Sequence, residues 1–275
     1  MTIDHVVDYD RYQHLLFERR ENGILWITIN RPEALNATNR RLHTELCEVW
    51  KDVTLDEQTK VVVITGAGRA FSAGGDLDEL VDQMAGNFDL MTGMLKEAGD
   101  LVYNIIECPK PIISAINGIA VGAGLVVALM ADISIMAKEA RLTDGHTRLG
   151  VAAGDHAVIL WPLLCGMAKA KYLLLSCDFV DGEEADRVGL VSKSVPMAEL
   201  NDEALKQATN LATGAQWAIR WTKRSLNLWL KQAAPNFDAS LAFEMLGFMG
   251  SDVKEGSAAI KEKRAPRYPS ATAAG

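Results

Sequence analysis

Phe71-Ser-Ala-Gly-Gly-Asp-Leu77 and Asn117-Gly-Ile-Ala-Val-Gly-Ala-Gly124 are the two stretches of sequence that decide the fold. Each is a glycine-rich turn that follows an apolar, β-branched run (residues 61–64 and 112–116) and leads towards a helical pattern. Two turns of this kind can aim two backbone N–H groups at one point. Such a pair of donors stabilises the negative oxygen of an enolate or of a tetrahedral intermediate. The turns therefore predict a site built partly from main-chain atoms.

Strand and helix patterns alternate around these turns. Two apolar runs flank Glu21-Asn-Gly23, which predicts a β-hairpin over 15–19 and 24–29, because Asn-Gly supplies the positive φ that a tight turn needs. The apolar patterns predict buried strands over 61–64, 112–116 and 133–137, and helices over 38–54, 89–107 and 122–130. This alternation predicts an α/β fold with a buried parallel sheet.

After about residue 200 the pattern is helical, with helices predicted over 203–212, 215–231, 237–249 and 252–263. We therefore expect an N-terminal tail over 1–13, an α/β core over 14–200 and a helical C-terminal region over 201–275. The C-terminal helices carry more apolar residues than one amphipathic face needs, which predicts self-association. These residues are Trp217, Trp221, Leu226, Trp229, Phe243, Met245 and Phe248.

Composition and charge narrow the class of protein. The chain is 49% hydrophobic and 23% charged, as is typical of a soluble enzyme, and its net charge of −8 argues against nucleic-acid binding. The four cysteines (Cys47, Cys108, Cys165 and Cys177) form no CxxC pair and the N-terminus is unlike a signal peptide, so we expect a reduced, cytoplasmic protein. No apolar stretch approaches the roughly 18–20 residues of a membrane span, so no membrane association is expected.

Three kinds of ligand site are not supported by the motifs. The strand and turn over residues 61–68 would need a third glycine at position 71 to bind a dinucleotide, and that residue is Phe71. There is no phosphate-binding P-loop motif either. His5, His14 and His43 have no carboxylate or cysteine neighbours at ligand spacing, and we predict no metal.

Further motifs extend the pattern of the two turns. They are Asn30-Arg-Pro-Glu-Ala-Leu-Asn36, Lys110-Pro-Ile-Ile-Ser-Ala-Ile-Asn-Gly118, Asp132, Leu149-Gly150 and Lys254-Glu-Gly256. In this order, over about residues 14–268, the sequence resembles the crotonase superfamily, which includes enoyl-CoA hydratases and isomerases. The resemblance implies a spiral of ββα units with a C-terminal helical region that builds homotrimers or hexamers. It also implies an acyl-CoA substrate, with coenzyme A as part of the substrate and no separate cofactor.

The resemblance implies that the backbone N–H groups of Ala73 and Ala123 form the oxyanion hole. It implies substrate contacts from both turns and from the region near residue 34, namely Ala34, Leu35, Ala73, Gly74, Gly75, Asp76, Leu77, Gly122 and Ala123. The catalytic positions depart from the family, because its two glutamates fall on Val126 and His146. Adding water to a double bond needs two groups in different protonation states, so we do not expect hydration by a pair of glutamates.

His146 is the candidate replacement base, because an unperturbed imidazole has a pKa of about 6.5. Asp155 lies nine residues later, beyond Gly154, and is the candidate that orients the imidazole. The residues from 144 to 162 also resemble the 6-oxocamphor hydrolase branch, which hydrolyses a carbon–carbon bond in a cyclic β-diketone without coenzyme A. That branch uses a glutamate on a late helix, for which Glu244 is the candidate.

Each of these residues has a structural alternative. His146 fits a surface loop, Asp155 fits a helix N-cap for residues 157–164, and Glu244 fits a packed interface. His156 is the alternative imidazole.

Three functions follow from this pattern. The first is an enzyme that acts on an acyl-CoA thioester through an enolate, the second a β-diketone hydrolase, and the third a binding protein that kept the fold without chemistry. A His146–Asp155 pair that faces both turns favours the enzymes. Lys and Arg side chains at the pocket mouth, near the C-terminal tail, favour coenzyme A over a free diketone.

Overall fold

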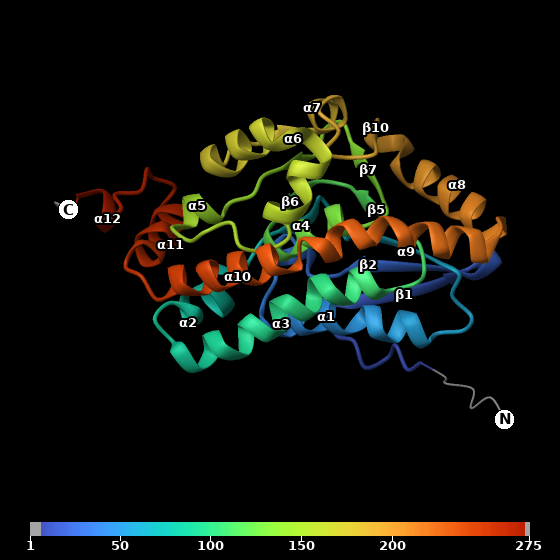
Figure 1. Ribbon diagram of the computed structural model, residues 1–275, viewed down its shortest axis with the longest axis horizontal. Helices are drawn as coiled ribbons and strands as arrows, with labels where there is room; N and C mark the ends of the chain where they lie inside the picture. The colour runs from blue at the N-terminus through green and yellow to red at the C-terminus, as the bar shows by residue number, and fades with distance from the viewer. Residues whose placement is uncertain (1–6, 273–275) are drawn as a thin grey trace.

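The computed structural model describes residues 7–272 and contains two β-sheets surrounded by helices (Figure 1). The larger sheet has six strands in the order β1 (Leu15–Arg20), β2 (Ile24–Ile29), β3 (Val61–Gly66), β5 (Ile112–Ile116), β7 (Ile133–Ala137) and β10 (Lys193–Val195). The smaller sheet has four strands in the order β4 (Ala70–Ala73), β6 (Ile119–Val121), β8 (Arg141–Leu142) and β9 (Val180–Asp181). The predicted α/β class and parallel sheet are confirmed, because among the described strands only β1–β2 and β8–β9 pair antiparallel.

The chain visits the two sheets alternately, which gives the spiral. β3, β5 and β7 lie in the larger sheet, and each is followed in sequence by a strand of the smaller sheet, β4, β6 or β8. The predicted hairpin over β1 and β2 is also confirmed, with Asn22 at φ 62° and Gly23 at φ 78° in its turn. The two glycine-rich turns follow the ends of β4 and β6, and they lie side by side because these two strands pair in parallel.

Helices cover the sheets. The long ones are α1 (Arg40–Leu55), α3 (Phe88–Glu107), α4 (Gly122–Met130), α6 (Ala157–Ser176), α8 (Leu200–Thr213), α9 (Gln216–Gln232), α10 (Ala234–Phe248) and α11 (Asp252–Glu262). The short ones are α2 (Asp82–Met84), α5 (His146–Leu149), α7 (Gly182–Arg187) and α12 (Pro269–Thr272). Asn39 and Asn87 begin α1 and α3 by accepting the backbone N–H groups of Leu42 and Leu90.

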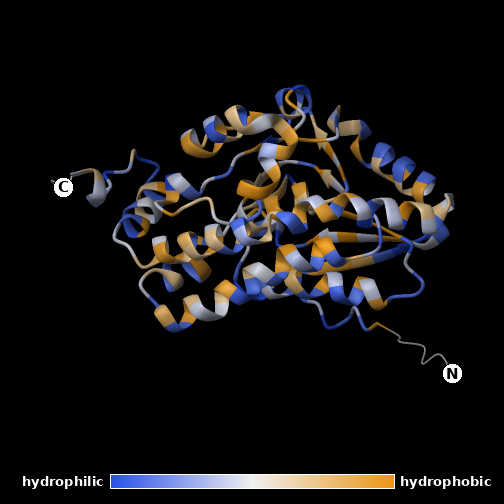
Figure 2. Ribbon diagram, in the orientation of Figure 1, coloured by the Kyte–Doolittle hydropathy of each residue, from blue (hydrophilic) through white to orange (hydrophobic). Residues whose placement is uncertain are grey.

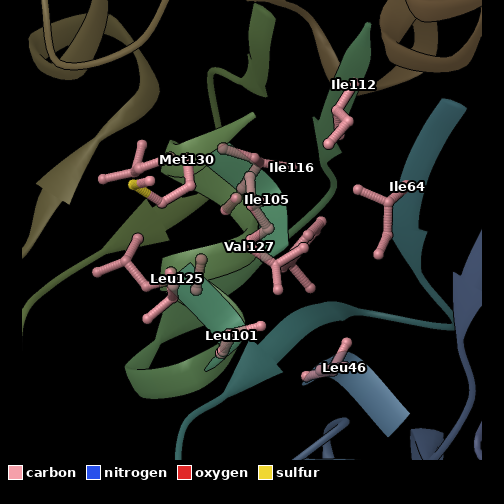
Figure 3. Packing of buried hydrophobic residues seen from close by; sticks show 14 of the residues in the cluster. Leu46, Ile64, Leu101, Ile105, Ile112, Ile116, Leu125, Val127 and Met130 are labelled. Carbon is pink, nitrogen blue, oxygen red and sulfur yellow. The ribbon is translucent and has the colours of Figure 1, made fainter. Parts of the chain in front are cut away.

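The core fills the space between α1, α3, α4 and the strands. Figure 2 shows the strands of the larger sheet mainly in hydrophobic colours, whereas the surrounding helices alternate between hydrophobic and hydrophilic residues. Figure 3 shows part of this core, where the labelled side chains are Leu46, Ile64, Leu101, Ile105, Ile112, Ile116, Leu125, Val127 and Met130. Burial of this apolar surface fixes α3 and α4 beside the two turns.

The boundaries at residues 13 and 200 stay predictions, and side-chain packing continues across both of them. Residues 1–6 lie outside the described residues, but the rest of the expected N-terminal tail is packed: Tyr9 stacks on Phe17 at 4.3 Å, and buried Tyr12 donates to Asp52 at 2.7 Å. The C-terminal helices share one hydrophobic cluster with the α/β core. The expected helical region is therefore present, but it packs on the core. Helix α8 packs against strands of the larger sheet, and α10 packs against α3 and α6.

Helix α6 corrects the prediction that no segment reaches the length of a membrane span. Residues 157–176 are long and apolar enough by length and composition alone, with a mean hydropathy of 1.5. Gly166, however, has a φ of 77° and a ψ of 153°, which interrupts the helix near its middle. Each uninterrupted part is about half of the roughly 20 residues that a spanning helix needs.

Candidate active site

A cavity of about 460 Å³ lies between the two glycine-rich turns and helices α3, α5, α10 and α11. Its wall is mostly apolar, with Val126, Leu101 and Phe248 among the lining residues. Its polar groups are few, and His146, Asp155 and Glu244 are all among them. The structure therefore brings the three predicted acid–base residues to the same cavity as both turns.

The two turns touch each other through main-chain atoms. Gly122 has a φ of 55°, and a Cβ added to it would lie 3.1 Å from the Cα of Gly74 and 3.3 Å from the nitrogen of Gly75. A Cβ added to Gly124 would overlap the side chain of Ser72. The glycines are therefore needed because the β4 turn and the start of α4 pack in direct contact.

The first expected amide donor is wrong. The N–H of Ala73 is donated to the carbonyl oxygen of Leu35 at 3.0 Å, so it is not free for a substrate. Gly75 lies opposite Thr38 in a parallel bridge, but the bonds of that bridge are made by its neighbours. Thr38 donates its N–H to the carbonyl oxygen of Gly74, and Asp76 donates its N–H to the carbonyl oxygen of Thr38, so the N–H of Gly75 stays unused. Within residues 7–272 no group accepts the Gly75 N–H, and Gly75 lines the cavity.

The second amide has the expected geometry. Ala123 is the second residue of α4, and N–H groups in the first turn of a helix have no acceptor within the helix. Ala123 lines the cavity, and its N–H gains from the positive end of the helix dipole. The main-chain pair is thus Gly75 and Ala123, two residues from the position that the resemblance implied for the first donor.

Most of the other expected substrate contacts line the cavity, but three do not. Ala73, Gly74, Leu77 and Gly122 do so, together with the two donors. Ala34 and Leu35 do not line the cavity. The carbonyl oxygen of Leu35 accepts the N–H of Ala73. Asp76 also lies outside it: its carboxylate accepts the N–H groups of Asp78 and Glu79 at the start of the helical turn Leu77–Val81.

His146 is held by a carboxylate that the sequence analysis had not chosen as a site residue. Its Nδ1 lies 2.9 Å from Oδ1 of Asp144, which also accepts the backbone N–H of His146 at 3.2 Å. Its Nε2 lies 3.6 Å from Oε1 of Glu244 and 4.0 Å from Oδ2 of Asp155. The orienting partner of the imidazole is therefore Asp144, whereas Asp155 and Glu244 face the other ring nitrogen.

Gly154 explains how a residue from α10 reaches this cluster. A Cβ added to Gly154 would overlap both the Cβ of Glu244 and the carbonyl oxygen of Ser240. The Ser240 hydroxyl also donates to the carbonyl oxygen of Gly154 at 2.8 Å. Because no side chain intervenes, α10 rests on the loop after His146 and brings the Glu244 carboxylate into the cavity.

Asp155 is fixed by a second imidazole. The indole N–H of Trp161 can only donate, and it lies 3.3 Å from Nε2 of buried His156. Nδ1 of His156 therefore carries the hydrogen, which it donates to Oδ1 of Asp155 at 3.0 Å. The same oxygen accepts the N–H of Ala157 at the start of α6, so Asp155 both caps a helix and faces the cavity. His156 thus positions the carboxylate of Asp155.

The charges of the cluster alter its proton affinities. Burial alone would lower the pKa of His146, but the three carboxylates around it raise that pKa well above the ordinary value. Burial raises the pKa of Glu244 to about 8, against the opposing attraction of His146. Burial would also raise the pKa of Asp155, but its contacts with His156 and the charge of His146 lower it to about 2.

These shifts change the expected roles. The raised pKa of His146 favours the protonated imidazole, whereas the sequence analysis expected a free base. The raised pKa of Glu244, about 8, suits this carboxyl to exchange a proton with a substrate. Oε2 of Glu244 and Oδ2 of Asp144 are buried and have no partner among the described residues, which leaves both carboxylates capacity to accept further hydrogen bonds.

Among residues 7–272, two groups of side chains have donor atoms close enough to hold a metal ion. Asp144, His146 and Asp155 form one, and His43, Cys47 and Glu97 form the other, with the donor atoms of each group within 4.8 Å of one another. In both groups an imidazole nitrogen is already hydrogen-bonded to a carboxylate. The absence of a resident metal stays a prediction.

The exposed end of the cavity is lined by Lys263, Arg264 and Pro266, which follow α11. Arg264 pairs with Glu255 at 2.5 Å and with Glu262 at 2.5 Å. The mouth therefore presents positive charge close to the cavity, although Arg264 is shared with acidic neighbours.

The chain is similar to known proteins over almost its whole length. The Enoyl-CoA hydratase/isomerase family model matches residues 19–271. The 1,2-epoxyphenylacetyl-CoA isomerase of Escherichia coli (strain K12) is 33% identical over 254 residues, which are 90% of this chain and 95% of that protein. A crystal structure of an enoyl-CoA hydratase/isomerase from Mycobacterium paratuberculosis is 30% identical with a TM-score of 0.85, and covers 91% of this chain and 99% of that one. The structure of a β-diketone hydrolase from Anabaena sp. PCC 7120, bound to (S)-3-oxocyclohexyl acetic acid, is 26% identical with a TM-score of 0.81. The match covers 88% of this chain and 96% of that one.

Proposed function

The chain belongs to the enoyl-CoA hydratase/isomerase family and is an enzyme of that family, and from this premise we propose that it moves a proton within an acyl-CoA thioester through an enolate intermediate. The observation that carries the proposal is the presence of two kinds of group in one cavity. The unpaired amides of Gly75 and Ala123 and the Glu244–His146 pair all line it.

The amides stabilise the negative charge that forms on the thioester oxygen. Removal of a C–H proton next to a thioester sends the electron pair to the carbonyl oxygen, and two N–H donors hold the resulting enolate. Ala123 offers in addition the N-terminus of α4. No side chain is needed for this task, so alanine is as suitable here as glycine.

Glu244 accepts the proton and returns it to another carbon of the same substrate. Its raised pKa makes the carboxylate a stronger base than an ordinary glutamate, while the His146 imidazolium stabilises the ionised form during transfer. Asp144 positions the imidazole through Nδ1. Because Val126 supplies no second acid or base, one proton-transfer centre serves both steps, which suits isomerisation better than addition of water.

A hydrogen-exchange experiment tests this proposal. The enzyme is incubated with a β,γ-enoyl-CoA in D₂O, and isomerisation and deuterium incorporation are followed by mass spectrometry. We expect both reactions in the wild type, loss of both in His146→Ala, and weak or absent hydration of crotonyl-CoA. Rapid hydration of crotonyl-CoA that survives His146→Ala would overturn the proposal.

The second candidate is hydrolysis of a β-diketone, and the His146–Asp155–Glu244 cluster favours it. Water would add to one carbonyl carbon, and the amides would hold the tetrahedral oxyanion. The carbon–carbon bond would then break, with its electron pair passing to the second carbonyl as an enolate that takes up a proton. The likeness to the Anabaena hydrolase supports this reading. Conversion of a cyclic 1,3-diketone to a keto acid, with no reaction on enoyl-CoA thioesters, would establish it instead.

The mouth of the cavity bears on the choice between the two substrates. Lys263 and Arg264 line the opening, where the phosphates of coenzyme A would be attracted by their charge. A free diketone carries no phosphate and gains nothing from them. Lys263→Glu is therefore expected to weaken binding of acyl-CoA, measured by calorimetry, without weakening binding of a diketone.

We also propose that the enzyme is a homotrimer or a pair of trimers. Apolar side chains on α9 and α10 remain exposed by more than half, which a water-facing surface does not favour. They are Trp217, Trp221, Leu226, Trp229 and Phe243. Met245 and Phe248, which were expected in the same role, are buried against the core of their own chain. Sedimentation of a monomer at micromolar concentration would contradict this assembly.

A further inference from the structure

A second polar centre lies in the same cavity. His43 of α1 is only 5% exposed and lines the cavity. Around it the wall is formed by apolar residues of α3: Met94, Ala98, Leu101 and Val102. A buried imidazole among apolar side chains is costly unless its nitrogens find partners.

One nitrogen of His43 has such a partner. Its Nδ1 lies 2.7 Å from Oε1 of Glu97 on α3. The same oxygen accepts the hydroxyl of Thr44 at 2.9 Å, and the other carboxylate oxygen pairs with Arg40 at 2.6 Å. Burial would raise the pKa of Glu97, but its contacts with His43, Thr44 and Arg40 lower it, so the carboxylate stays ionised. An ionised carboxylate only accepts, and Nδ1 therefore carries the hydrogen of this bond.

The other nitrogen faces the cavity without a partner. Nε2 of His43 has no hydrogen-bond partner among residues 7–272, and it keeps some contact with solvent. With Nδ1 fixed by Glu97, the free Nε2 has a fixed direction. This is the arrangement of a binding group that is oriented before the ligand arrives.

We propose that His43 is a substrate-binding residue that recognises a hydroxyl group at the end of the acyl chain remote from the thioester. A hydroxyl suits this position because it both donates and accepts, and so it pairs with Nε2 in either protonation state of the ring. A plain hydrocarbon end would pack on the apolar wall but would displace water from Nε2 without offering it a hydrogen bond, which costs affinity. The inference rests on the proposed acyl-CoA function and adds the chemical class of the acyl group.

The test compares ω-hydroxyhexanoyl-CoA and ω-hydroxyoctanoyl-CoA with hexanoyl-CoA and octanoyl-CoA. Dissociation constants are measured by calorimetry, and kcat/KM is measured on the matching β,γ-enoyl thioesters. For the wild type we expect a preference of about 10-fold to 100-fold for the hydroxylated member of at least one pair, the range for a hydrogen bond to a bound substrate. His43→Leu should remove the preference, and His43→Gln, whose amide also donates and accepts, should restore part of it.

Two further variants separate recognition from general damage. Glu97→Gln removes the charge that fixes the imidazole and should reduce the preference. Glu48→Gln makes the same change on α1, where Glu48 meets Arg11 on the half-exposed surface, and should leave the preference intact. Folding of each variant is checked by circular dichroism and thermal melting, so a collapsed variant is recognised.

The outcomes distinguish this inference from the proposed function. Turnover of the thioesters with no hydroxyl preference, or a preference that survives His43→Leu, overturns the role of His43 alone. A hydroxyl preference in binding without turnover of any thioester overturns the proposed reaction and keeps the role of His43. If only cyclic diketones bind, the same comparison is made between a hydroxylated and an unsubstituted cyclic diketone, and equal affinity there overturns the role of His43.

Discussion

The glycine-turn wall of the cavity uses main-chain N–H groups of the two glycine-rich turns, whereas a second wall uses side chains from residues 144–155 and from Glu244 on α10. The first wall needs only that Gly75 and Ala123 keep their N–H groups free, so it tolerates a change of side chain such as alanine at position 123. The second wall depends on the identity of every group in it. Chemistry can therefore change on the second wall while the first continues to hold an oxyanion.

The largest expected effect is on the side-chain wall. Glu244→Gln keeps the size of the side chain but removes the base, so kcat should fall by about 10²–10⁴-fold, the usual cost of losing a general acid or base. The measurement is steady-state kinetics at the pH optimum, with Glu48→Gln as the matched control. Activity of Glu244→Gln within a few-fold of the wild type would show that another residue transfers the proton.

The next effect concerns the main-chain wall. Ala123→Pro removes the N–H at the second position of α4, where proline fits the first turn of a helix. Loss of one oxyanion-hole donor should lower kcat by about 10²–10³-fold. Ala123→Gly keeps the N–H and serves as the control. A proline variant that folds and retains full kcat would exclude this amide from the oxyanion hole.

A third comparison lies within the side-chain wall, between two aspartates. Asp144 contacts Nδ1 of His146 at 2.9 Å, whereas Asp155 is 4.0 Å from Nε2. Asp144→Asn should therefore lower kcat by about 10-fold or more, as expected for a hydrogen bond to a charged group, and Asp155→Asn should lower it less. The reverse order in kinetics at one pH would restore Asp155 as the orienting partner.

The two walls also differ in how well the sequence predicts them. Glycine turns after apolar runs are local signals, so the strands 112–116 and 133–137, the helix 122–130 and the position of the first wall were all predictable. The choice between Ala73 and Gly75 was not, because it depends on the Leu35 carbonyl, which a distant segment brings to Ala73. The short strands of the smaller sheet were missed, since two to four residues carry too little periodicity.

For the side-chain wall, the sequence predicted which residues take part but not how they pair. His146, Asp155 and Glu244 came from motif positions, and all three line the cavity. Their pairing was mistaken because sequence spacing cannot measure a ring orientation, and Asp144, two residues before His146, was the available signal. The proton affinities could not be predicted at all, because they arise from complete burial of several charges together.

The smallest expected effect is on stability, and its sign follows from Glu244. The pKa of this carboxyl is about 8 in the folded chain and ordinary when unfolded, so between these values the folded state holds a proton that the unfolded state has released. The contribution of Glu244 to stability is therefore greatest below its ordinary pKa and is lost as the pH rises through about 8. Glu244→Gln removes this titration, so its melting temperature relative to the wild type should be higher at pH 9 than at pH 5. A relative gain of several degrees is expected by calorimetry, because each pH unit between the two pKa values changes the stability by about 1.4 kcal/mol. A difference that is constant across this range would mean that Glu244 is ionised throughout, and the proton would then have to be held by His146 alone.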